Sequence, residues 1–244
     1  MSLKVWSREL AAQTGVNRVY VGPTPVQRIY VGSTKVWSKI DFHSIGAGAG
    51  ANTRVLSWTE DVAAGDGVVV FGVIYTQAAI GPAASVDGGA MSILQSPVQC
   101  YTDGTNRLYL YALGITNPHN GNGLTVATAL TGGAAVFYHH ANSIAVSNVS
   151  SFGTPVTATG SAGAASVSID EPSSGRIVAA MAQNQIGAST FTSLTGGWTS
   201  RYNPAPSSVF ANARSLLIGD SPPGDVTLGA TATAPWGAIA IPVF

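Results

Sequence analysis

The residue types that perform catalysis are present in this chain, but their spacing builds none of the familiar reaction sites. Among the four histidines, His139 and His140 are adjacent, so a strand would point them to opposite faces and they could not bind one metal ion. No serine lies in the G-x-S-x-G turn that exposes a nucleophile, and no GxxxxGKS/T loop is present to bind phosphate. The sequence therefore predicts no catalytic residues, no metal site and no cofactor.

Two adjacent acidic pairs are the remaining candidates for acid–base chemistry. Glu60 with Asp61, or Asp170 with Glu171, could bind calcium or act as the carboxylate pair of a glycoside hydrolase. Both pairs flank predicted turns, where acidic side chains are common, so we expect no enzymatic activity and keep a cell-wall hydrolase as the least favoured hypothesis. The single cysteine, Cys100, excludes an intrachain disulfide and a CxxC zinc site, and we expect it to be a small buried hydrophobe.

One group of aromatic residues could bind a sugar. Trp198, Arg201 and Tyr202 lie close together in the sequence, and aromatic rings with polar neighbours can stack on sugar rings. They make a carbohydrate-binding module the alternative function, with a host cell-surface glycan as its ligand. We expect the tryptophans Trp58 and Trp236 to fill the core of a sheet instead.

The strongest pattern is a tandem repeat near the start of the chain. Residues 16–22 read V-N-R-V-Y-V-G, and residues 26–32 read V-Q-R-I-Y-V-G. Alternation of β-branched and aromatic residues that stops at glycine predicts two short strands, and residues 23–25 and 33–34 have the composition of turns. Such short strands bury no core of their own, so they indicate an attachment module that lies on a partner.

The repeat region also carries most of the basic charge. Residues 1–41 hold six basic and two acidic residues, a net charge of +4, whereas residues 42–244 hold five arginines and nine acids, a net charge of −4. A basic arm that docks on an acidic protein surface fits this division, and a nucleic-acid partner does not, because hydrophobic strand positions separate the basic residues. The residues expected to bind the partner of the arm are Arg18, Tyr20, Arg28, Tyr30 and Trp37.

The composition indicates a protein of large assemblies. Charged residues make up 9% of the 244 residues and the formal net charge is zero, which protects a free protein poorly from self-association, so we expect a homo-oligomer. The longest apolar stretch, residues 68–75, is too short to cross a bilayer, and no apolar signal segment starts the chain. We therefore expect synthesis in a cytoplasm, without membrane insertion.

After the arm, the pattern is one short strand after another. Clusters of Gly, Asp, Asn and Pro separate runs of β-branched and apolar residues at fairly even spacing, which predicts an all-β, jelly-roll-like β-sandwich. Residues 68–75 and 177–182 lack polar positions and should be central strands covered on both faces. The predicted organisation is an attachment arm over 1–41, a Gly/Ala joint or tight β crossing over 42–51, and a β-sandwich domain over 52–244.

Several of these motifs resemble a known family of viral proteins. The paired V-x-R-V/I-Y-V-G motif, followed by residues 33–37 (S-T-K-V-W), is similar to the start of minor tail proteins of siphoviruses that infect actinobacteria such as mycobacteria. Residues 193–198 (S-L-T-G-G-W), 210–214 (F-A-N-A-R) and 235–240 (P-W-G-A-I-A) resemble the β-rich domain of that group. The resemblance thus spans most of the chain.

The resemblance implies a bacteriophage virion structural protein at the tail tip or baseplate, present in symmetric copies and in contact with the host surface. Its implied partners are other tail proteins and further copies of itself in a homotrimer. Its implied location is the virion tail, after assembly in the host cytoplasm, and the family supplies no catalytic residues. A minor tail protein anchored through its arm is therefore the predicted function, and the glycan-binding module is the alternative.

Overall fold

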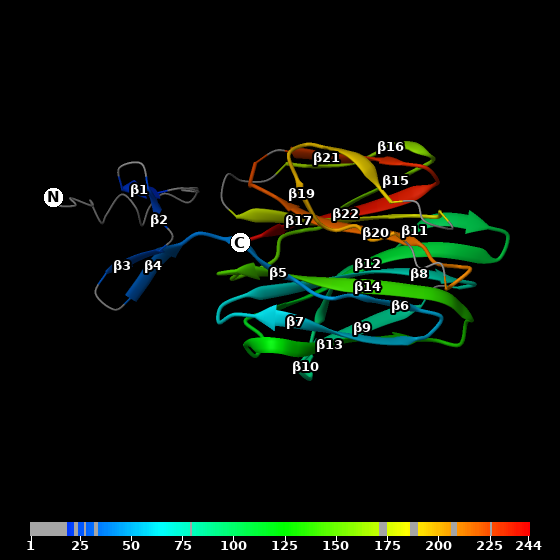
Figure 1. The fold of residues 1–244 in the computed structure, drawn as a ribbon, viewed down its shortest axis with the longest axis horizontal. Coiled ribbons are helices and arrows are strands. Elements are labelled where there is room, and N and C mark those ends of the chain that lie inside the picture. Colours follow the sequence, from blue (N-terminus) through cyan, green and yellow to red (C-terminus); the bar gives the residue numbers. More distant parts are fainter. Residues whose placement is uncertain are drawn as a thin grey trace.

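The computed structural model consists of β-strands joined by turns and loops (Figure 1). The part of the chain that it describes contains no helix, and so none long and apolar enough to cross a membrane. The all-β class predicted from the sequence is confirmed. The described residues are 19–21, 24–26, 28–31, 34–78, 80–170, 175–185, 190–205, 209–224 and 226–244.

Residues 39–244 form the body of the molecule, and the first half of this body is a sandwich of two antiparallel sheets. Its outer sheet has the strand order β10 (Gly89–Ala90), β9 (Gly81–Val86), β13 (Gly121–Thr131), β7 (Val55–Val62). Its inner sheet has the order β11 (Ser92–Asp103), β12 (Asn106–Thr116), β8 (Gly67–Thr76), β14 (Val136–Ser147), β5 (Asp41–Ile45), and β6 (Ala49–Ala51) also pairs with β14.

The second half of the body is a second sandwich of antiparallel sheets. Its inner sheet has the order β15 (Val156–Gly160), β22 (Trp236–Val243), β17 (Arg176–Gln183), β20 (Ser215–Ser221), β19 (Thr199–Tyr202). Its outer sheet has the order β16 (Gly163–Ile169), β21 (Val226–Ala232), β18 (Thr192–Thr195).

The two sandwiches follow the same connectivity. In each inner sheet the last strand, β14 or β22, lies between the first strand, β5 or β15, and the strand β8 or β17. In each outer sheet the strand β13 or β21 lies between β7 or β16 on one side and β9 or β18 on the other. Residues 41–147 and 156–243 therefore repeat one arrangement, and residues 52–244, expected as one sandwich, hold most of two.

The two inner sheets pack against each other, so the body is a stack of four sheets with three hydrophobic cores between them (Figure 1). Strand β8 serves two cores by alternation: Val68 faces the first outer sheet, whereas Val69 and Phe71 face the second inner sheet. All of β8 is buried, as is all of β17 after its first residue. The prediction that these two runs are central strands covered on both faces is confirmed.

The Gly/Ala stretch at 42–51 belongs to the first sandwich. Strands β5 and β6 both pair with β14, and between them Gly46 N donates to Ser143 O at 2.9 Å and Ala47 N donates to Thr59 O at 3.1 Å. A Cβ on Gly46 would lie 2.5 Å from Ser143 Oγ, closer than side chains approach, so glycine is needed where the chain passes so close. This segment is a tight crossing between the two sheets.

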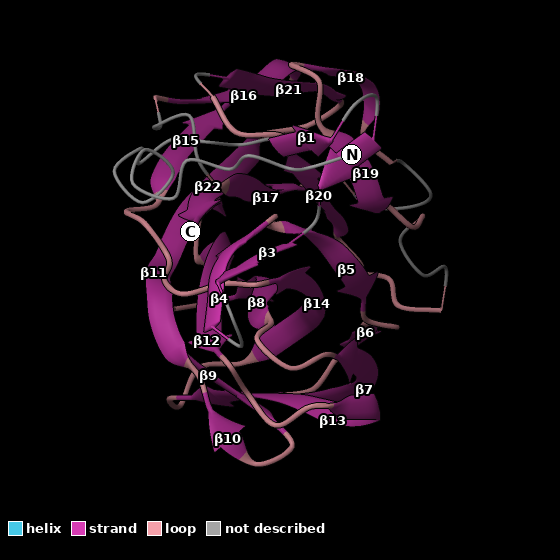
Figure 2. Cartoon of the chain, turned by 90° about the vertical axis from the view of Figure 1, so that its left-hand side faces the viewer, coloured by secondary structure: helices cyan, strands magenta, loops and turns pink. Residues whose placement is uncertain are grey.

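The arm contains two antiparallel hairpins that lie to one side of the body (Figures 1 and 2). Strand β1 (Val19–Val21) pairs with β2 (Thr24–Val26), and β3 (Arg28–Val31) pairs with β4 (Thr34–Ser38). The first copy pairs with residues 24–26, of which Val26 begins the second copy, and the second copy pairs with residues 34–38. The predictions of turns over 23–25 and 33–34 were wrong for Thr24, Pro25 and Thr34, because the repeat continues as T-x-V and closes each hairpin with a Val–Thr pair.

Figure 2 views the molecule from the side of the arm, where β3 and β4 lie in front of the ends of the inner-sheet strands. We call this end of the body the arm end. It is the end at which Asp41 pairs with Ser147 and Gly67 pairs with Thr116 across the first inner sheet. The chain also ends at this side of the body, as the label of the C-terminus in Figure 1 shows.

Candidate functional site at the root of the arm

Strand β5 fixes the arm to the body through charged side chains. Asp41 forms ion pairs with Lys39 and with Arg176 of β17, whose Nη1 lies 2.8 Å from Asp41 Oδ1. The backbone is held as well, because Asn148 Nδ2 donates to the carbonyl oxygen of Lys39 at 2.8 Å. Burial alone would raise the pKa of Asp41, but the hydrogen bond from Lys39 and the charge of Arg176 lower it below its ordinary value.

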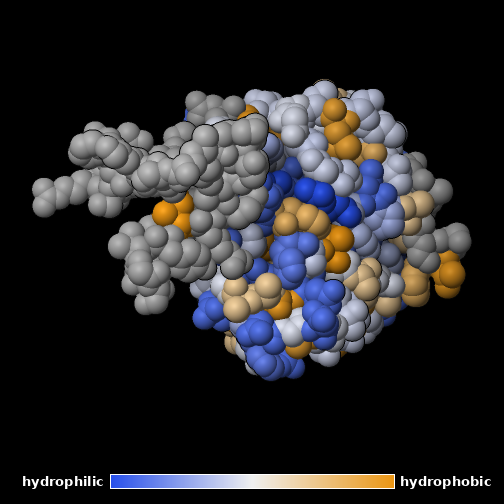
Figure 3. Space-filling model, turned by 60° about the vertical axis from the view of Figure 1, so that its left-hand side comes forward, coloured by the Kyte–Doolittle hydropathy of each residue, from blue (hydrophilic) through white to orange (hydrophobic). Residues whose placement is uncertain are grey.

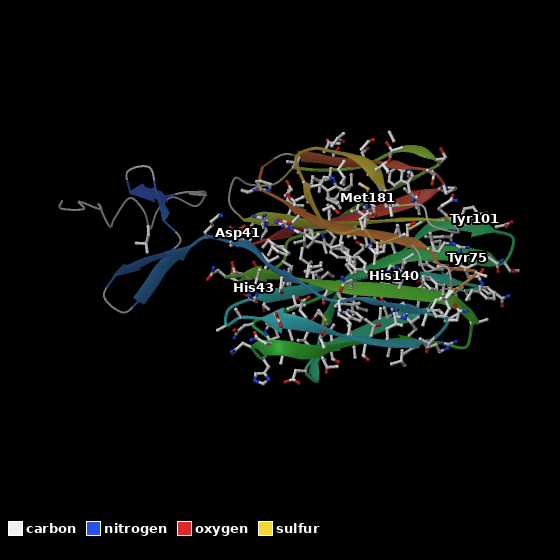
Figure 4. The ribbon with its side chains drawn as sticks, viewed as in Figure 1. Asp41, His43, Tyr75, Tyr101, His140 and Met181 are labelled. Carbon is white, nitrogen blue, oxygen red and sulfur yellow. The ribbon has the colours of Figure 1, made fainter. Side chains whose placement is uncertain are left out.

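The ionic chain continues to a fully buried carboxylate in the second sandwich. Asp220 on β20 forms ion pairs with both Arg176 and Arg201. The guanidinium carbon of Arg201 also lies 3.8 Å from the centre of the Phe42 ring on β5. These contacts join the root of the arm to the second inner sheet. Figure 4 shows Asp41 at this end of the molecule.

Two further residues of β5 contact the first sandwich. His43 Nδ1 lies 2.6 Å from Oδ2 of the buried Asp66, which also accepts a hydrogen bond from Ala63 N at 2.8 Å. Ser44 Oγ donates to the carboxylate of Glu60, which is buried too. Asp41 and Phe42 thus contact the second sandwich, and His43 and Ser44 contact the first, so this short strand connects the arm to both sandwiches.

Glu60 lies at the centre of a buried hydrogen-bond network. Its Oε2 accepts a hydrogen bond from Ser143 Oγ at 2.6 Å, and Ser143 Oγ accepts one from Trp58 Nε1 at 2.7 Å. Removal from water disfavours the ionised carboxylate more than the hydrogen bonds from Ser143 and Ser44 favour it, so the pKa of Glu60 is raised to about 7. When Glu60 carries a proton, Ser44 Oγ can donate instead to Asp61 O, 2.6 Å away.

Replacement of Glu60 by glutamine is expected to change how stability depends on pH. A carboxyl group whose folded pKa is raised from 4.5 to about 7 contributes stability that is complete below pH 4.5 and is lost as the pH rises through 7. The wild-type protein should therefore lose roughly 2–3 kcal/mol relative to Glu60→Gln between about pH 4.5 and 8. Urea titrations across this range give the difference in the free energy of unfolding between the two proteins.

Comparing the free energies of unfolding of the two proteins separates the effect of Glu60 from that of two buried histidines, whose effect on stability has the opposite pH dependence. Burial lowers the pKa of His139 to about 3 and that of His140 to about 4. Their contribution is complete above the ordinary pKa of 6.5 and is lost as the pH falls through the lower values, and it is present in both proteins. A difference that stays constant across the range would contradict the burial of Glu60 as a neutral acid.

The structure does not bring Trp198, Arg201 and Tyr202 together on an exposed surface. Trp198 is 6% exposed, lies in the core of the second sandwich, and donates from Nε1 to a backbone carbonyl at 3.1 Å. Arg201 is held by the buried carboxylate of Asp220, and the hydroxyl of the half-buried Tyr202 lies 2.8 Å from His140 Nε2. These three side chains do not form the predicted sugar-stacking face, because each has a partner inside the body.

Trp198→Ala is therefore expected to unfold the second sandwich more readily, with a loss of about 3–5 kcal/mol in the free energy of unfolding. The cause is the cavity left by a buried indole ring. Thr199→Ala, at the exposed neighbouring position, is the matched control and should change stability by less than about 0.5 kcal/mol. A Trp198→Ala protein as stable as the control, measured by urea unfolding, would make this ring a surface candidate again.

Other expectations for single residues are confirmed. Trp58 and Trp236 are each 6% exposed, and they lie in the cores of the first and the second sandwich respectively. Cys100 is buried, which raises the pKa of its thiol to about 12. His139 Nε2 lies 2.8 Å from the hydroxyl of Tyr111 in the core of the first sandwich. His140, on the opposite face of β14, lies between the inner sheets (Figure 4).

The described residues include no group of three or more side chains suited to bind a metal ion.

The residues predicted to anchor the arm are spread over both hairpins. Tyr20 lies in β1, Arg28 and Tyr30 lie in β3, and Trp37 lies in β4. Arg18 lies outside the described residues. In the second hairpin Tyr30 pairs with Lys35 and Trp37 pairs with Ile29, so these two predicted anchor residues do not lie opposite each other.

Three buried acids hold the root of the arm, Glu60, Asp66 and Asp220, and the sequence carries a signal of burial for the first and the last of them. Glu60 was named only as half of an acidic pair. Residues 215–221 (S-L-L-I-G-D-S) carry a lone acid in an apolar strand, and this signals a buried partner for Asp220. In residues 55–62 the inward positions are Leu, Trp, Glu and Val, an alternation that places Glu60 inside. Both acids could therefore have been found from the sequence.

The described surface around the arm end is polar. Figure 3 shows hydrophilic residues gathered there, with small apolar patches between them.

No protein-family model matches this chain, and neither a curated protein nor a solved structure matches it. Fold and geometry therefore carry the functional argument.

Proposed function

We propose that this protein is a bacteriophage virion structural protein, a minor tail protein at the tail tip that attaches through its N-terminal arm. The observation that carries the proposal is the division of the chain into two small hairpins and a body with three cores of its own. Isolated two-stranded hairpins are marginally stable in water, so a partner surface is needed to hold them. Strand β5 connects such a partner to both sandwiches through Asp41, Phe42, His43 and Ser44.

The proposed partner of the arm is another tail protein with an acidic surface, since residues 1–41 carry a net charge of +4. We propose a homotrimer, assembled in the host cytoplasm and carried in the virion tail. The low content of charged residues, 9%, supports an assembled state, because it leaves a free chain poorly protected from association.

We also propose that each sandwich is a jelly roll. The strand orders support this topology. The inner sheets contain the orders β5-β14-β8 and β15-β22-β17, and the outer sheets contain the orders β7-β13-β9 and β16-β21-β18. Two-sheet jelly rolls are common in viral capsid proteins and lectins, so the topology is compatible with a virion component.

Localisation on purified phage particles tests the proposal. Gold-labelled antibodies against the body are expected to mark one end of the tail in electron micrographs. The control is the same antibody after adsorption with purified protein. If the particles carry no label while the infected host lysate contains the protein, it is not a virion component and the proposal fails.

A further inference from the structure

A groove of about 200 Å³ opens at the arm end, between strands β11 and β12 and the segment that links the two sandwiches. Apolar side chains of Leu94, Ile115 and Phe152 line it, together with the exposed Ser92 and Thr116. The register places the groove at the arm end. Ser92 pairs with Gly114, and Thr116 pairs with Gly67, the first residue of β8. The groove thus lies at the end of the body from which the arm leaves.

The groove lies beside an open sheet edge. Among the described strands, β11 is the last of the first inner sheet and has a neighbour on one side only. Ile93 is 53% exposed beside the groove, whereas Pro97 and three register shifts between Ile93 and Tyr101 interrupt the rest of this edge. The part of the edge with regular backbone next to the groove is therefore Ser92 and Ile93. An extended segment can pair with such an edge and place alternate side chains in the adjoining groove.

The charge of this end is opposite to that of the arm. Asp61, Asp87 and Asp170 are exposed, and Asp87 lies in the turn that leads into β10, where Ala90 lines the groove. The carboxylate of Asp87 also lies 2.5 Å from Nδ1 of the exposed His119. Of the arginines of residues 42–244, Arg176 and Arg201 lie at this end, and both are ion-paired with the buried Asp220.

We propose that the groove and the edge of β11 bind an arm hairpin of a second copy of this chain. The hairpins supply what the site needs: strand edges, β-branched residues at alternate positions, and positive charge. The arm leaves its own body at β5, at the opposite edge of the sheet from β11, which favours a site on a neighbouring copy. Such head-to-tail contacts form a ring when the rotation between copies closes, and a ring of three matches the proposed homotrimer. This inference rests on the proposed function of the arm: it assigns one of the two hairpins to a second copy of the chain and leaves the other for the acidic tail protein.

Cross-linking between full-length variants that each carry one added cysteine tests the proposal. The natural Cys100 is buried and has a raised thiol pKa, so it does not compete. One variant carries Ser92→Cys in the groove, and the other carries Thr34→Cys in β4 or Thr24→Cys in β2. The two are mixed and treated with a short bis-maleimide, and peptide mapping identifies the linked residues.

The expected result is a dimer linked between position 92 of one copy and position 24 or 34 of the other. The groove-blocking change Thr116→Arg should abolish this product, whereas Thr105→Arg, at an exposed turn at the other end of the body, should leave it unchanged. Absence of the mixed product overturns the proposal. So does a double-cysteine chain that links only within itself, which would mean that each arm folds onto its own body.

The proposed function is tested separately by labelling of phage particles. If the particles are labelled at the tail tip but position 92 never links to the arm, the arm binds a different tail protein and only this inference fails. If the arm links to position 92 but the particles carry no label, the inference stands as a mode of self-assembly and the tail proposal fails.

Discussion

A chain shortened to residues 52–244 is expected to lose its cooperative fold, whereas residues 39–244 should unfold as stably as the full chain. The shorter chain lacks β5 and β6, which cover the edge of β14, and it leaves the buried Asp66 and Glu60 without their partners on β5. A buried polar group without its partner costs roughly 1–3 kcal/mol. Together with the lost strand pairing, this approaches the whole stability of a domain, about 5–15 kcal/mol.

Equilibrium urea unfolding, followed by tryptophan fluorescence and circular dichroism, measures the effect. The chain 39–244 is the matched control because it keeps Lys39, Asp41 and the rest of β5 while lacking both hairpins. Equal unfolding midpoints for 52–244 and 39–244 would show that residues 42–51 are a joint outside the folded body, and that β5 does not hold the two sandwiches together.

Asp220→Ala is expected to lose about 3–5 kcal/mol in the free energy of unfolding, as much as Trp198→Ala. The alanine leaves the guanidinium groups of Arg176 and Arg201 without their shared carboxylate, and their side chains are only 11% and 25% exposed. Arg176 keeps Asp41, whereas among the described residues Arg201 keeps the ring of Phe42 but no acidic partner. For a chain of this length the loss corresponds to a fall of roughly 10 °C in Tm.

Asp170→Ala is the matched control for this substitution. It removes the same charge from an exposed position of the same sandwich and should change stability by less than about 0.5 kcal/mol. Differential scanning calorimetry of the two variants beside the wild-type protein makes the comparison. Equal Tm values for the two variants would contradict the ionic chain at the root of the arm.

Strands whose limits are set by local chemistry could be predicted from the sequence. Residues 67–76 and 226–232 form β8 and β21, whose limits follow from the sequence because runs of β-branched residues end there at turns rich in Gly, Asp and Pro. Strand β9 has no such signal. Its residues, G-P-A-A-S-V, have little pattern of their own, and pairing with β13 decides their conformation.

The stacking of two sandwiches could not be read from the sequence in the same way. Apolar residues throughout 68–75 and 177–182 indicated that both faces of these strands are covered, which was correct. Which sheet covers them depends on pairing between distant segments, such as β22 with β15 and β17. Such contacts leave no local pattern, so the duplication appeared only in three dimensions.

The same distinction explains the fate of the candidate sites. Proximity in sequence suggested that Trp198, Arg201 and Tyr202 act together, but the strand directs them to three different partners. Asp41 and Asp220 lie far apart in sequence and meet through Arg176. Spacing in the sequence thus did not predict which side chains contact each other where long-range strand pairing determines the neighbours.

The central claim, that the arm is an attachment device carried by a self-sufficient body, is tested most directly by incorporation into particles. Phages are assembled with either the full chain or residues 39–244, and the amount of the protein per purified particle is measured by quantitative mass spectrometry. The account predicts that residues 39–244 accumulate as folded protein in the lysate and are absent from the particles. Equal amounts of the two chains in the particles would show that the body makes the attachment and would contradict the account.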